Sequence, residues 1–497
     1  MGSNTFRLVV FRYRPGGPFQ LVDEIREVVR LSAGAGPAGL RPDAIARAER
    51  ASRLYSAFCA AAEIERVDAV ATSAVRDAAN QGDILRALRG DGDLPVRVLS
   101  ESEEARYGYL GAVNSTTLRD GHVLDVGGGS IQVSKVVGRE LESGTSRPLG
   151  AVRMTEAFLP GPAASRSELK ALRAHVSAHL ARIPSLGRHE GRLIGIGGTV
   201  RTLAAMGLKA AGHPITDPHG YVLEAGALEE LIKRMAALPA ARRSELPGLK
   251  EDRADITLAG AVTVAAVMER AGADRIEVCS EGLREGVFYE RFLAPADPPM
   301  VADVRRHSVR NVAATYAYDR EHCEHVAALA LGLYDELSAL GLQRADAAER
   351  ELLWAAAILH DVGVLVDYND HHKHSYYLVL NAGLPGYDHR ELALVALLVR
   401  AHRKGPPTPA LDGLDAVLRK EDHGRLDRLA ACLRIAEQLE RGRARGIRDL
   451  RVEAPDRRAR VVVSAEGDPA VALWSAEQER PAFARAFGRH LELVAEG

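Results

Sequence analysis

Apolar and polar positions near the start of the chain alternate between strand-like and helix-like patterns. Residues 5–13 and 20–31 are rich in β-branched and apolar residues on either side of the turn Pro15-Gly16-Gly17-Pro18, which predicts an antiparallel hairpin. Further elements are predicted in this order: a helix over 42–65, a strand over 67–72, a helix after Asp77, a strand over 95–99 and a helix opened by Ser100. Strands that alternate with helices indicate an α/β layer.

The same plan then restarts further along the chain. Residues 122–126 and 130–137 have strand patterns on either side of three glycines, and residues 192–198 form a strand pattern that runs into a helix at Thr199. We interpret this repetition as a second copy of the first lobe. The sequence therefore predicts a duplicated α/β core.

The pattern changes after a proline-rich segment at 294–299. From residue 308 to about 441 helix follows helix with no strand pattern, so we place a domain boundary at the prolines. The tail has strand patterns over 450–454 and 458–465 and an amphipathic stretch over 474–494, which is typical of a small α/β appendage.

Composition narrows the class of protein. A chain of 497 residues is too long for one hydrophobic core, and 46% hydrophobic with 27% charged residues is ordinary for a globular protein. A net charge of −2 argues against a nucleic-acid or membrane partner. The cysteines are far apart and form no CxxC pair, which indicates reduced thiols and a cytoplasmic location: Cys59, Cys279, Cys323 and Cys432.

A glycine-rich turn is the sharpest chemical signal. In Asp125-Val126-Gly127-Gly128-Gly129-Ser130 a strand ends in an acid and a glycine turn leads into a second strand. Glycines let backbone N–H groups approach a phosphate closely, and Asp125 is placed to hold Mg²⁺ or Mn²⁺, through waters. The alternative reading is an ordinary hairpin turn.

Two other small-residue loops have the same character. Gly2-Ser3-Asn4-Thr5 opens the first hairpin, and Gly197-Gly198-Thr199 lies at a strand-to-helix junction. Loops of this kind on duplicated hairpins clamp a phosphoanhydride in the actin, Hsp70 and sugar-kinase superfamily, and no GxxxxGK[ST] loop is present to indicate a P-loop fold. The alternative for the third loop is a tight strand-to-helix connection.

Together these segments resemble a known family. The matching segments are GSNTFRLVV, ATSAVRDAAN, LSESEEARYGYLGA, DVGGGS, GIGGTVRTLA and SEGLREGVFYE. They occur in the order typical of the Ppx/GppA family of exopolyphosphatases and guanosine pentaphosphate phosphohydrolases, over roughly residues 1–295, and the helical part resembles the HD-type domain found in many members. The resemblance implies duplicated actin-like (ASKHA, ribonuclease H-like) lobes over 1–114 and 115–296, followed by a helical HD-type domain with a small α/β tail over 297–497.

The resemblance also implies residue roles and a reaction. The family hydrolyses a terminal phosphoryl group with Mg²⁺ and water. Glu104 matches the catalytic glutamate of the motif, and Arg76 is the candidate for a guanidinium fork on a phosphate. Without the resemblance, Glu103 and Glu104 read as acids that complement a helix N-terminus.

Two positions depart from the family pattern. An aspartate usually precedes the first glycine by two positions, but here Met1 stands directly before Gly2, so we expect the natural chain to start further upstream. Where many members have a glutamate, this chain has Gln132, an amide that adds no charge to a metal site.

Histidines concentrate in the helical part. Ten of the seventeen histidines lie between His307 and His423. The order of HD-type metal hydrolases, with further ligands for a second metal, predicts a possible metal site at these residues: His325, His360, Asp361, His374, His402 and Glu437. The alternative is a set of hydrogen-bonded or exposed histidines with no ligand role.

These observations favour an exopolyphosphatase that releases orthophosphate from inorganic polyphosphate by metal-assisted attack of water. A pppGpp 5′-phosphohydrolase is the second candidate. A polyphosphate or nucleotide sensor without activity, and a phosphodiesterase that uses the histidine site, remain open. The resemblance also implies a homodimer.

Overall fold

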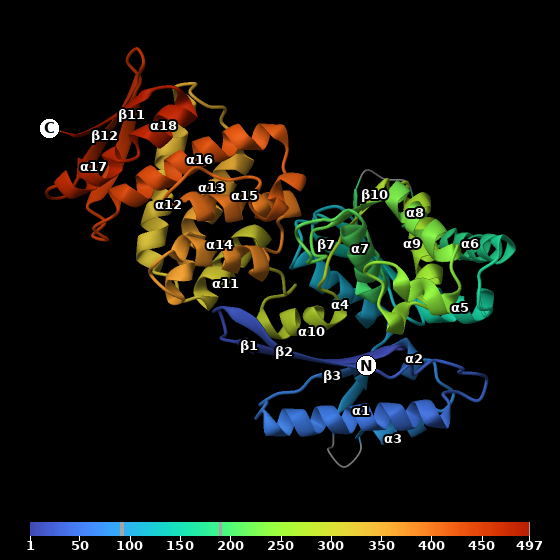
Figure 1. Ribbon diagram of the computed structural model, residues 1–497. Coiled ribbons are helices and arrows are strands. Elements are labelled where there is room, and N and C mark those ends of the chain that lie inside the picture. The colour runs from blue at the N-terminus through green and yellow to red at the C-terminus, as the bar shows by residue number, and fades with distance from the viewer. Residues whose placement is uncertain (90–93, 188–190, 497) are drawn as a thin grey trace. The chain divides into compact units, whose positions relative to one another are not determined.

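The computed structural model of the protein describes residues 1–89, 94–187 and 191–496 (Figure 1). The chain divides into two compact units, Met1–Val304 and the part from Arg305 onward. This division lies a few residues after the boundary at 296/297 that the proline-rich segment predicts. The two lobes expected within residues 1–296 belong to one compact unit.

The first unit begins with the predicted hairpin. Strands β1 (Thr5–Tyr13) and β2 (Phe19–Val28) are antiparallel. The short parallel strands β3 (Ala69–Ala71) and β4 (Val96–Val98) follow. The helices of this lobe are α1 (Pro42–Ala61), α2 (Ser73–Arg76) and α3 (Gln81–Arg89). The backbone N–H of Thr72 donates to the carbonyl of Met1 at 3.3 Å, which aligns the start of β1 with β3. The hairpin therefore places Gly2–Thr5 beside the end of β3.

The second lobe is built on one mixed sheet with the strand order β7-β6-β5-β8-β10-β9. Its strands are β5 (Gly121–Val126), β6 (Ile131–Val137), β7 (Glu140–Arg147), β8 (Arg192–Ile196), β9 (Val222–Glu224) and β10 (Arg275–Val278). Strands β5, β6 and β7 form an antiparallel meander, whereas β5, β8 and β10 are parallel. The glycine turns at the ends of β5 and β8 therefore lie side by side at one edge of the sheet.

Helices cover this sheet. They are α4 (Glu101–Val113), α5 (Ala151–Phe158), α6 (Arg166–Leu180), α7 (Gly197–Ala210), α8 (Ala225–Ala236), α9 (Thr257–Ala271) and α10 (Leu283–Phe292), with short 3₁₀ turns at Ala240–Glu245 and Glu251–Arg253. Helix α9 is apolar on nearly every face and is buried almost throughout, because it packs against α5, α6 and α8.

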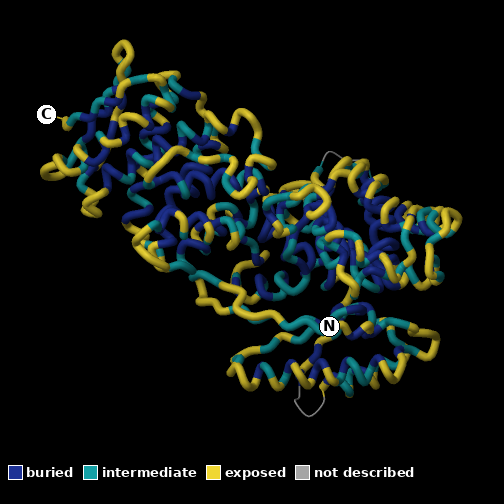
Figure 2. The backbone as a smooth tube through the Cα atoms, viewed as in Figure 1, coloured by how far each residue is buried: buried dark blue, intermediate teal, exposed yellow. Residues whose placement is uncertain are grey.

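Helix α10 joins the two lobes of the first unit. It packs closely along α4, and a Cβ at Gly286 would lie 1.9 Å from the carbonyl oxygen of Tyr107, so only glycine fits there. On its other side Phe288 stacks on Phe11 of the β1–β2 hairpin at a centroid distance of 4.1 Å, and Phe292 lies 5.1 Å from Phe19. Much of the hairpin is half-buried or exposed (Figure 2), but Phe6 is fully buried in the core of the first lobe. The aromatic contacts with α10 therefore cover the far part of the hairpin.

The second unit is helical with a small sheet at its end. Its helices are α11 (Val304–Thr315), α12 (Arg320–Ala339), α13 (Ala347–Leu359), α14 (His371–Ala382), α15 (His389–Ala401) and α16 (Lys420–Leu439), with 3₁₀ turns at Val362–Leu365 and Leu411–Ala416. The tail adds β11 (Ile447–Glu453), β12 (Arg458–Ala465), α17 (Ala470–Glu477), α18 (Arg480–Phe487) and β13 (His490–Ala495). None of the described helices is long and apolar enough to cross a membrane.

The tail differs from its prediction in one respect. The amphipathic stretch 474–494 is not one continuous element, because α17 ends at Glu477, α18 ends before Gly488, and the chain then enters β13. Gly488 adopts a φ of +65°, a left-handed conformation that ends a helix readily. β13 pairs in parallel with β12.

Candidate functional site

The three glycine loops border one cavity in the first unit. The cavity measures about 1270 Å³, and its lining includes Gly2–Thr5, Gly127, Gly128, Gly197, Gly198 and Thr199. The first two loops touch, because a Cβ at Gly128 would lie 3.0 Å from the Cβ of Ser3, and one at Gly129 would lie 3.1 Å from the Oγ of Ser3. Ser130 is buried directly behind them. The structure therefore brings together the loops predicted to bind phosphate.

Asp125 occupies the point where the second and third loops meet. Gly197 has a φ of +86°, and a Cβ there would lie 2.3 Å from the Oδ1 of Asp125. Any side chain at this position would collide with the carboxylate and require a strained backbone. The shielding of the cleft from water raises the pKa of Asp125 to about 6.

Asp125 is the one predicted metal ligand of this cleft. Among the described residues it belongs to no group of three histidine, cysteine or carboxylate ligands close enough to hold an ion. Mg²⁺ commonly takes one or two carboxylates and completes its shell with waters and substrate phosphates. A carboxylate beside the glycine loops, as Asp125 is, is therefore compatible with Mg²⁺.

Glu103 and Glu104, at the start of α4, have different roles. Glu103 forms a capping box with Ser100, in which its carboxylate accepts the Ser100 N–H at 2.8 Å. Glu104 points inward and is only 4% exposed. The interpretation of these acids as helix-capping groups therefore applies to Glu103 and leaves Glu104 for another role.

The Glu104 carboxylate has two donors. Arg76 donates to its Oε1 through Nη1, and Gln132 donates to its Oε2 through Nε2 at 3.1 Å. Burial raises the pKa of Glu104 to about 7, and Arg76 opposes this rise. Neither Glu104 nor Arg76 lines the cavity in this conformation. Glu104 is close enough to Asp125 for the negative charge of Asp125 to add to the rise in the Glu104 pKa.

Gln132 has a role that the sequence does not reveal. It stands opposite Asp125 in the β5–β6 register, and its Nε2 also donates to the Oγ of Ser130 at 2.9 Å. A glutamate here would present an anion to Glu104, whereas the amide presents a donor. The departure from the family pattern therefore supports the charge of Glu104.

An array of arginines lines the cavity and was missed by sequence reasoning. Six arginines are in the lining, and the array consists of four of them, Arg7, Arg201, Arg253 and Arg284. Three of them lie within the quoted family segments but far apart along the chain, and only the fold brings them together. Burial, together with neighbouring arginines, lowers the pKa of Arg7 and that of Arg253 to about 10. At neutral pH the guanidinium groups remain charged and repel one another.

These arginines differ in how they are held. Arg7 and Arg284 share Glu24, with N···O distances of 2.5 and 3.2 Å, and Arg201 donates to the carbonyl of Ser280 at 2.5 Å. The guanidinium of Arg253 makes no hydrogen bond or ion pair with any described residue, and it lies against Gly198 of the third loop. Arg253 is thus free to bind an anion.

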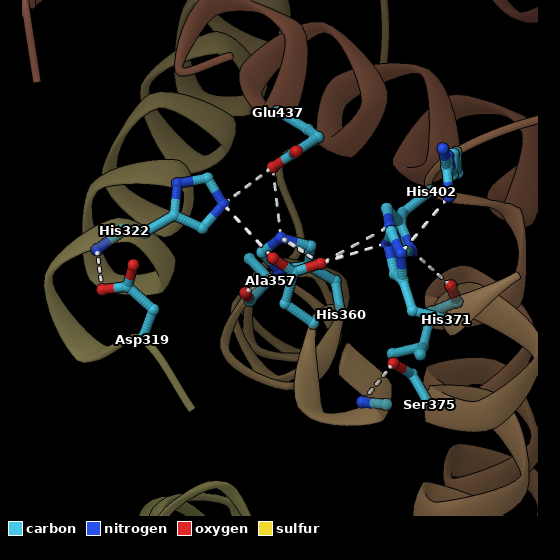
Figure 3. Close-up of polar contacts among 12 residues, drawn as sticks. Asp319, His322, Ala357, His360, His371, Ser375, His402 and Glu437 are labelled. Atoms are coloured by element: carbon cyan, nitrogen blue, oxygen red, sulfur yellow. Dashed lines mark hydrogen bonds and ion pairs between the residues drawn. The ribbon is translucent and has the colours of Figure 1, made fainter. Parts of the chain in front are cut away.

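A second cluster of functional side chains lies in the helical unit (Figure 3). His322 comes from α12, His360 and Asp361 from the end of α13, His371 from the start of α14, His402 from the end of α15, and Glu437 from α16. The ligand atoms of His322, His360 and Asp361 lie within 4.8 Å of one another, and so do those of Asp361, His371 and His402. The structure therefore brings together four of the six predicted metal ligands.

His325 and His374 were predicted as ligands, but the structure places neither in this cluster. Both nitrogens of His325 have other partners: Nδ1 lies 2.7 Å from Glu440 and Nε2 lies 2.8 Å from the carbonyl of Ile447. His374 is half-buried, three residues after His371 on α14, and belongs to neither ligand group among the described residues. His322 and His371, each one turn earlier on the same helix, take their places.

Comparison with known proteins gives two family matches. Residues 9–294 match the model described as the Ppx/GppA phosphatase family, and residues 304–468 match Ppx/GppA phosphatase, domain III. A solved Ppx/GppA family member from Aquifex aeolicus is 27% identical, with a TM-score of 0.50, over 58% of this chain and 94% of that one. Another structure of an Aquifex aeolicus PPX-GPPA enzyme is 28% identical with the same TM-score, over 58% and 96%.

An exopolyphosphatase from Cytophaga hutchinsonii ATCC 33406 shares the fold. It is 22% identical, with a TM-score of 0.55, over 59% of this chain and 96% of that one. The solved structures thus align with little more than half of this chain, whereas the two family models together reach into its helical unit.

Proposed function

Because the chain belongs to the Ppx/GppA phosphatase family, with its actin-like lobes, we propose that it is an exopolyphosphatase. It would release the terminal orthophosphate of inorganic polyphosphate by attack of water. One observation carries this proposal: the glycine loops, the carboxylate of Asp125 and an array of arginines line a single cavity.

The loops would bind the terminal phosphoryl group. Backbone N–H groups of the glycine turns and the side chains of Ser3 and Asn4 are the available donors, and they would hold its oxygens in a fixed orientation. Phosphoryl transfer requires positioning and charge neutralisation more than covalent catalysis. Asp125 would hold the Mg²⁺, or Mn²⁺, which would neutralise charge on the phosphates.

Glu104 would act as the general base. A base works best when its pKa is close to the working pH, and burial raises the pKa of Glu104 to about 7. Arg76 and Gln132 fix the orientation of the carboxylate through one hydrogen bond to each oxygen. To accept a proton from water at the terminal phosphate, Glu104 would exchange its contact with Arg76, which would leave the guanidinium available to a phosphate oxygen.

The arginine array supports a polyanionic substrate. The four guanidinium groups of the array line one cavity, where neighbouring arginines help to lower the pKa of Arg7, Arg201 and Arg253, and their mutual repulsion would be relieved by a chain of several phosphates. Arg253, which has no acid partner among the described residues, would bind phosphates next to the terminal one.

The test compares phosphate release from two substrates. Purified full-length protein with Mg²⁺ or Mn²⁺ would be given either inorganic polyphosphate or pppGpp. We expect polyphosphate to be the better substrate by kcat/KM. Faster turnover of pppGpp would support the 5′-phosphohydrolase instead, and tight binding of polyphosphate without turnover would indicate a sensor.

A further inference from the structure

The cluster of histidines and carboxylates in the helical unit is not used by the proposed hydrolysis. It combines four imidazoles and two carboxylates from five helical segments: His322, His360, Asp361, His371, His402 and Glu437. Each of the four histidines is at least 95% buried, as is Asp361. Side chains of this kind are costly to bury unless they are paired or bound to a metal, so their convergence needs an explanation.

Hydrogen bonds fix the tautomer of three of these histidines. The Nδ1 atoms of His360, His371 and His402 lie 2.7, 2.8 and 2.7 Å from backbone carbonyls three residues earlier in the chain. A carbonyl oxygen only accepts, so each Nδ1 must carry the proton and donate it. Each Nε2 is then left with a lone pair in the neutral ring. This is the arrangement in which metal-binding histidines are commonly held.

Two of these lone pairs face each other. The Nε2 atoms of His371 and His402 are 3.0 Å apart, and His371 Nε2 is also 3.2 Å from the Oδ1 of Asp361. Two neutral acceptors and an anion at such distances repel one another unless a positive species lies between them. One half of the cluster, formed by His371, His402 and Asp361, thus has two nitrogens and one oxygen close together.

The other half of the cluster, formed by His322, His360 and Glu437, repeats this arrangement. The Nε2 atoms of His322 and His360 each lie 3.1 Å from the Oε2 of Glu437. All three atoms are buried, and none has a hydrogen-bond partner among the described residues, because the distances are short but the directions are not those of a hydrogen bond. Asp361 stands between the two halves, because its Oδ2 lies 3.7 Å from the Nε2 of His322 and its Oδ1 lies 3.2 Å from the Nε2 of His371.

We propose that the helical unit binds two divalent transition-metal ions, bridged by Asp361. His322, His360 and Glu437 would hold one ion, and His371 with His402 would hold the other. A set of four imidazoles and two carboxylates favours Mn²⁺, Fe²⁺, Co²⁺ or Zn²⁺ over Mg²⁺ and Ca²⁺, which prefer oxygen ligands. This site is independent of the proposed exopolyphosphatase cleft.

The charge of the loaded centre indicates what it would bind. Two divalent ions carry four positive charges, and Asp361 with Glu437 supplies two negative ones. Arg443, whose Nη2 donates to the Oδ2 of Asp361 at 2.5 Å, adds a further positive charge at the edge of the cluster, with its side chain 43% exposed. The centre would therefore take an anion, and inorganic phosphate is a suitable probe.

The test measures metal content in full-length protein. Asp125→Asn removes the metal ligand of the other cleft and serves as the background for every variant. Protein stripped with a chelator would be reloaded with Co²⁺, freed of excess metal by gel filtration and analysed for elements and for visible cobalt absorption. We expect two equivalents of cobalt per chain in the background protein. His371→Ala should retain about one equivalent, and the matched control His374→Ala should retain two. Phosphate should change the cobalt spectrum of the loaded background protein.

Asp361→Asn and His402→Gln provide second variants if one substitution prevents folding, and circular dichroism identifies folded samples. The proposal is overturned if the folded background protein retains no stoichiometric cobalt. It is also overturned if His371→Ala loses no more metal than His374→Ala. That result would mean that protons, and not a metal ion, lie between the closely spaced nitrogen and oxygen atoms of the cluster. An unchanged cobalt spectrum would overturn the anion site. Polyphosphate hydrolysis by protein with wild-type Asp125 is measured separately, so failure of one proposal does not affect the other.

Discussion

The cleft of the first unit and the histidine cluster of the second are both buried and charged, but with opposite character. The cleft gathers guanidinium groups and backbone N–H donors near Asp125, and Glu104 is buried outside its lining with Arg76 as a donor. The cluster gathers ring nitrogens with free lone pairs around Asp361 and Glu437. A site rich in donors is suited to an anion, whereas a site rich in acceptors is suited to a cation. The balance of donors and acceptors thus distinguishes a substrate site from a metal site.

The largest expected effect tests whether Glu104 acts as the general base. Glu104→Gln should lower the rate of polyphosphate hydrolysis by about a hundredfold or more, with substrate binding near normal, because an amide cannot accept the proton of water. Steady-state kinetics and a binding assay measure the two quantities. The matched control is Glu103→Gln, which weakens the helix cap but should leave kcat within about twofold. Equal losses in both variants would contradict the assignment.

The next test removes one cation from the cleft. Arg253→Ala should raise KM for long-chain polyphosphate by about tenfold, equivalent to the loss of one charge-assisted hydrogen bond, with little change in kcat. The control is Arg242→Ala, an exposed arginine that pairs with Glu245. An unchanged KM would show that the array does not contact the substrate.

The pH profile tests the acids of the cleft. The pKa of Glu104 is raised to about 7 and that of Asp125 to about 6, so both become ionised as pH rises through these values. Below pH 6 the rate should fall at least tenfold per pH unit, and above about pH 8 it should level off. A flat profile between pH 5 and 8 would exclude titration of Glu104 as the source of the base. The measurement is kcat/KM across this range in buffers of equal ionic strength.

A smaller effect is expected at Gln132. Gln132→Glu places a second carboxylate beside Glu104 in place of its amide donor, which should raise the pKa of Glu104 further. Activity at pH 7 should fall several-fold and recover at higher pH. A uniform loss at all pH values would instead indicate a packing defect, and Gln132→Asn provides an uncharged comparison.

The smallest effect on hydrolysis should come from the helical unit. His360→Ala combined with Asp361→Ala should leave polyphosphate turnover within about twofold, because the cleft residues belong to the other unit, while metal content falls. Loss of hydrolysis in a folded double variant would show that polyphosphate turnover depends on the histidine cluster.

The sequence predicted the parts of the fold that have strong local signals. The β1–β2 hairpin, the α4 cap at Ser100 and the glycine turn after Asp125 all appear where expected. Strand β7 was not predicted, because ELESGTSR alternates polar and small residues at the edge of the sheet. The arginine array was missed for another reason: no local pattern links Arg7, Arg201 and Arg253.

The histidine ligands show how far motif order can mislead. His322 and His325 are three residues apart on α12, and His371 and His374 are three apart on α14. Residues at this spacing lie on neighbouring parts of a helix surface, so spacing alone does not decide which one faces the cluster. Packing decides it: β11 and Glu440 bind His325 instead.

The aromatic contacts between α10 and the β1–β2 hairpin have a consequence for synthesis of the chain. Phe11 leaves the ribosome early, but its partner Phe288 emerges only after more than half of the chain has been made. At common elongation rates this interval is on the order of tens of seconds. During it Phe11 and Phe19 have no native cover, although Phe6 can already pack with the helices of the first lobe, and exposed apolar strands can pair with other chains. Nascent chains that stall before α10 should therefore be prone to aggregate and to recruit chaperones.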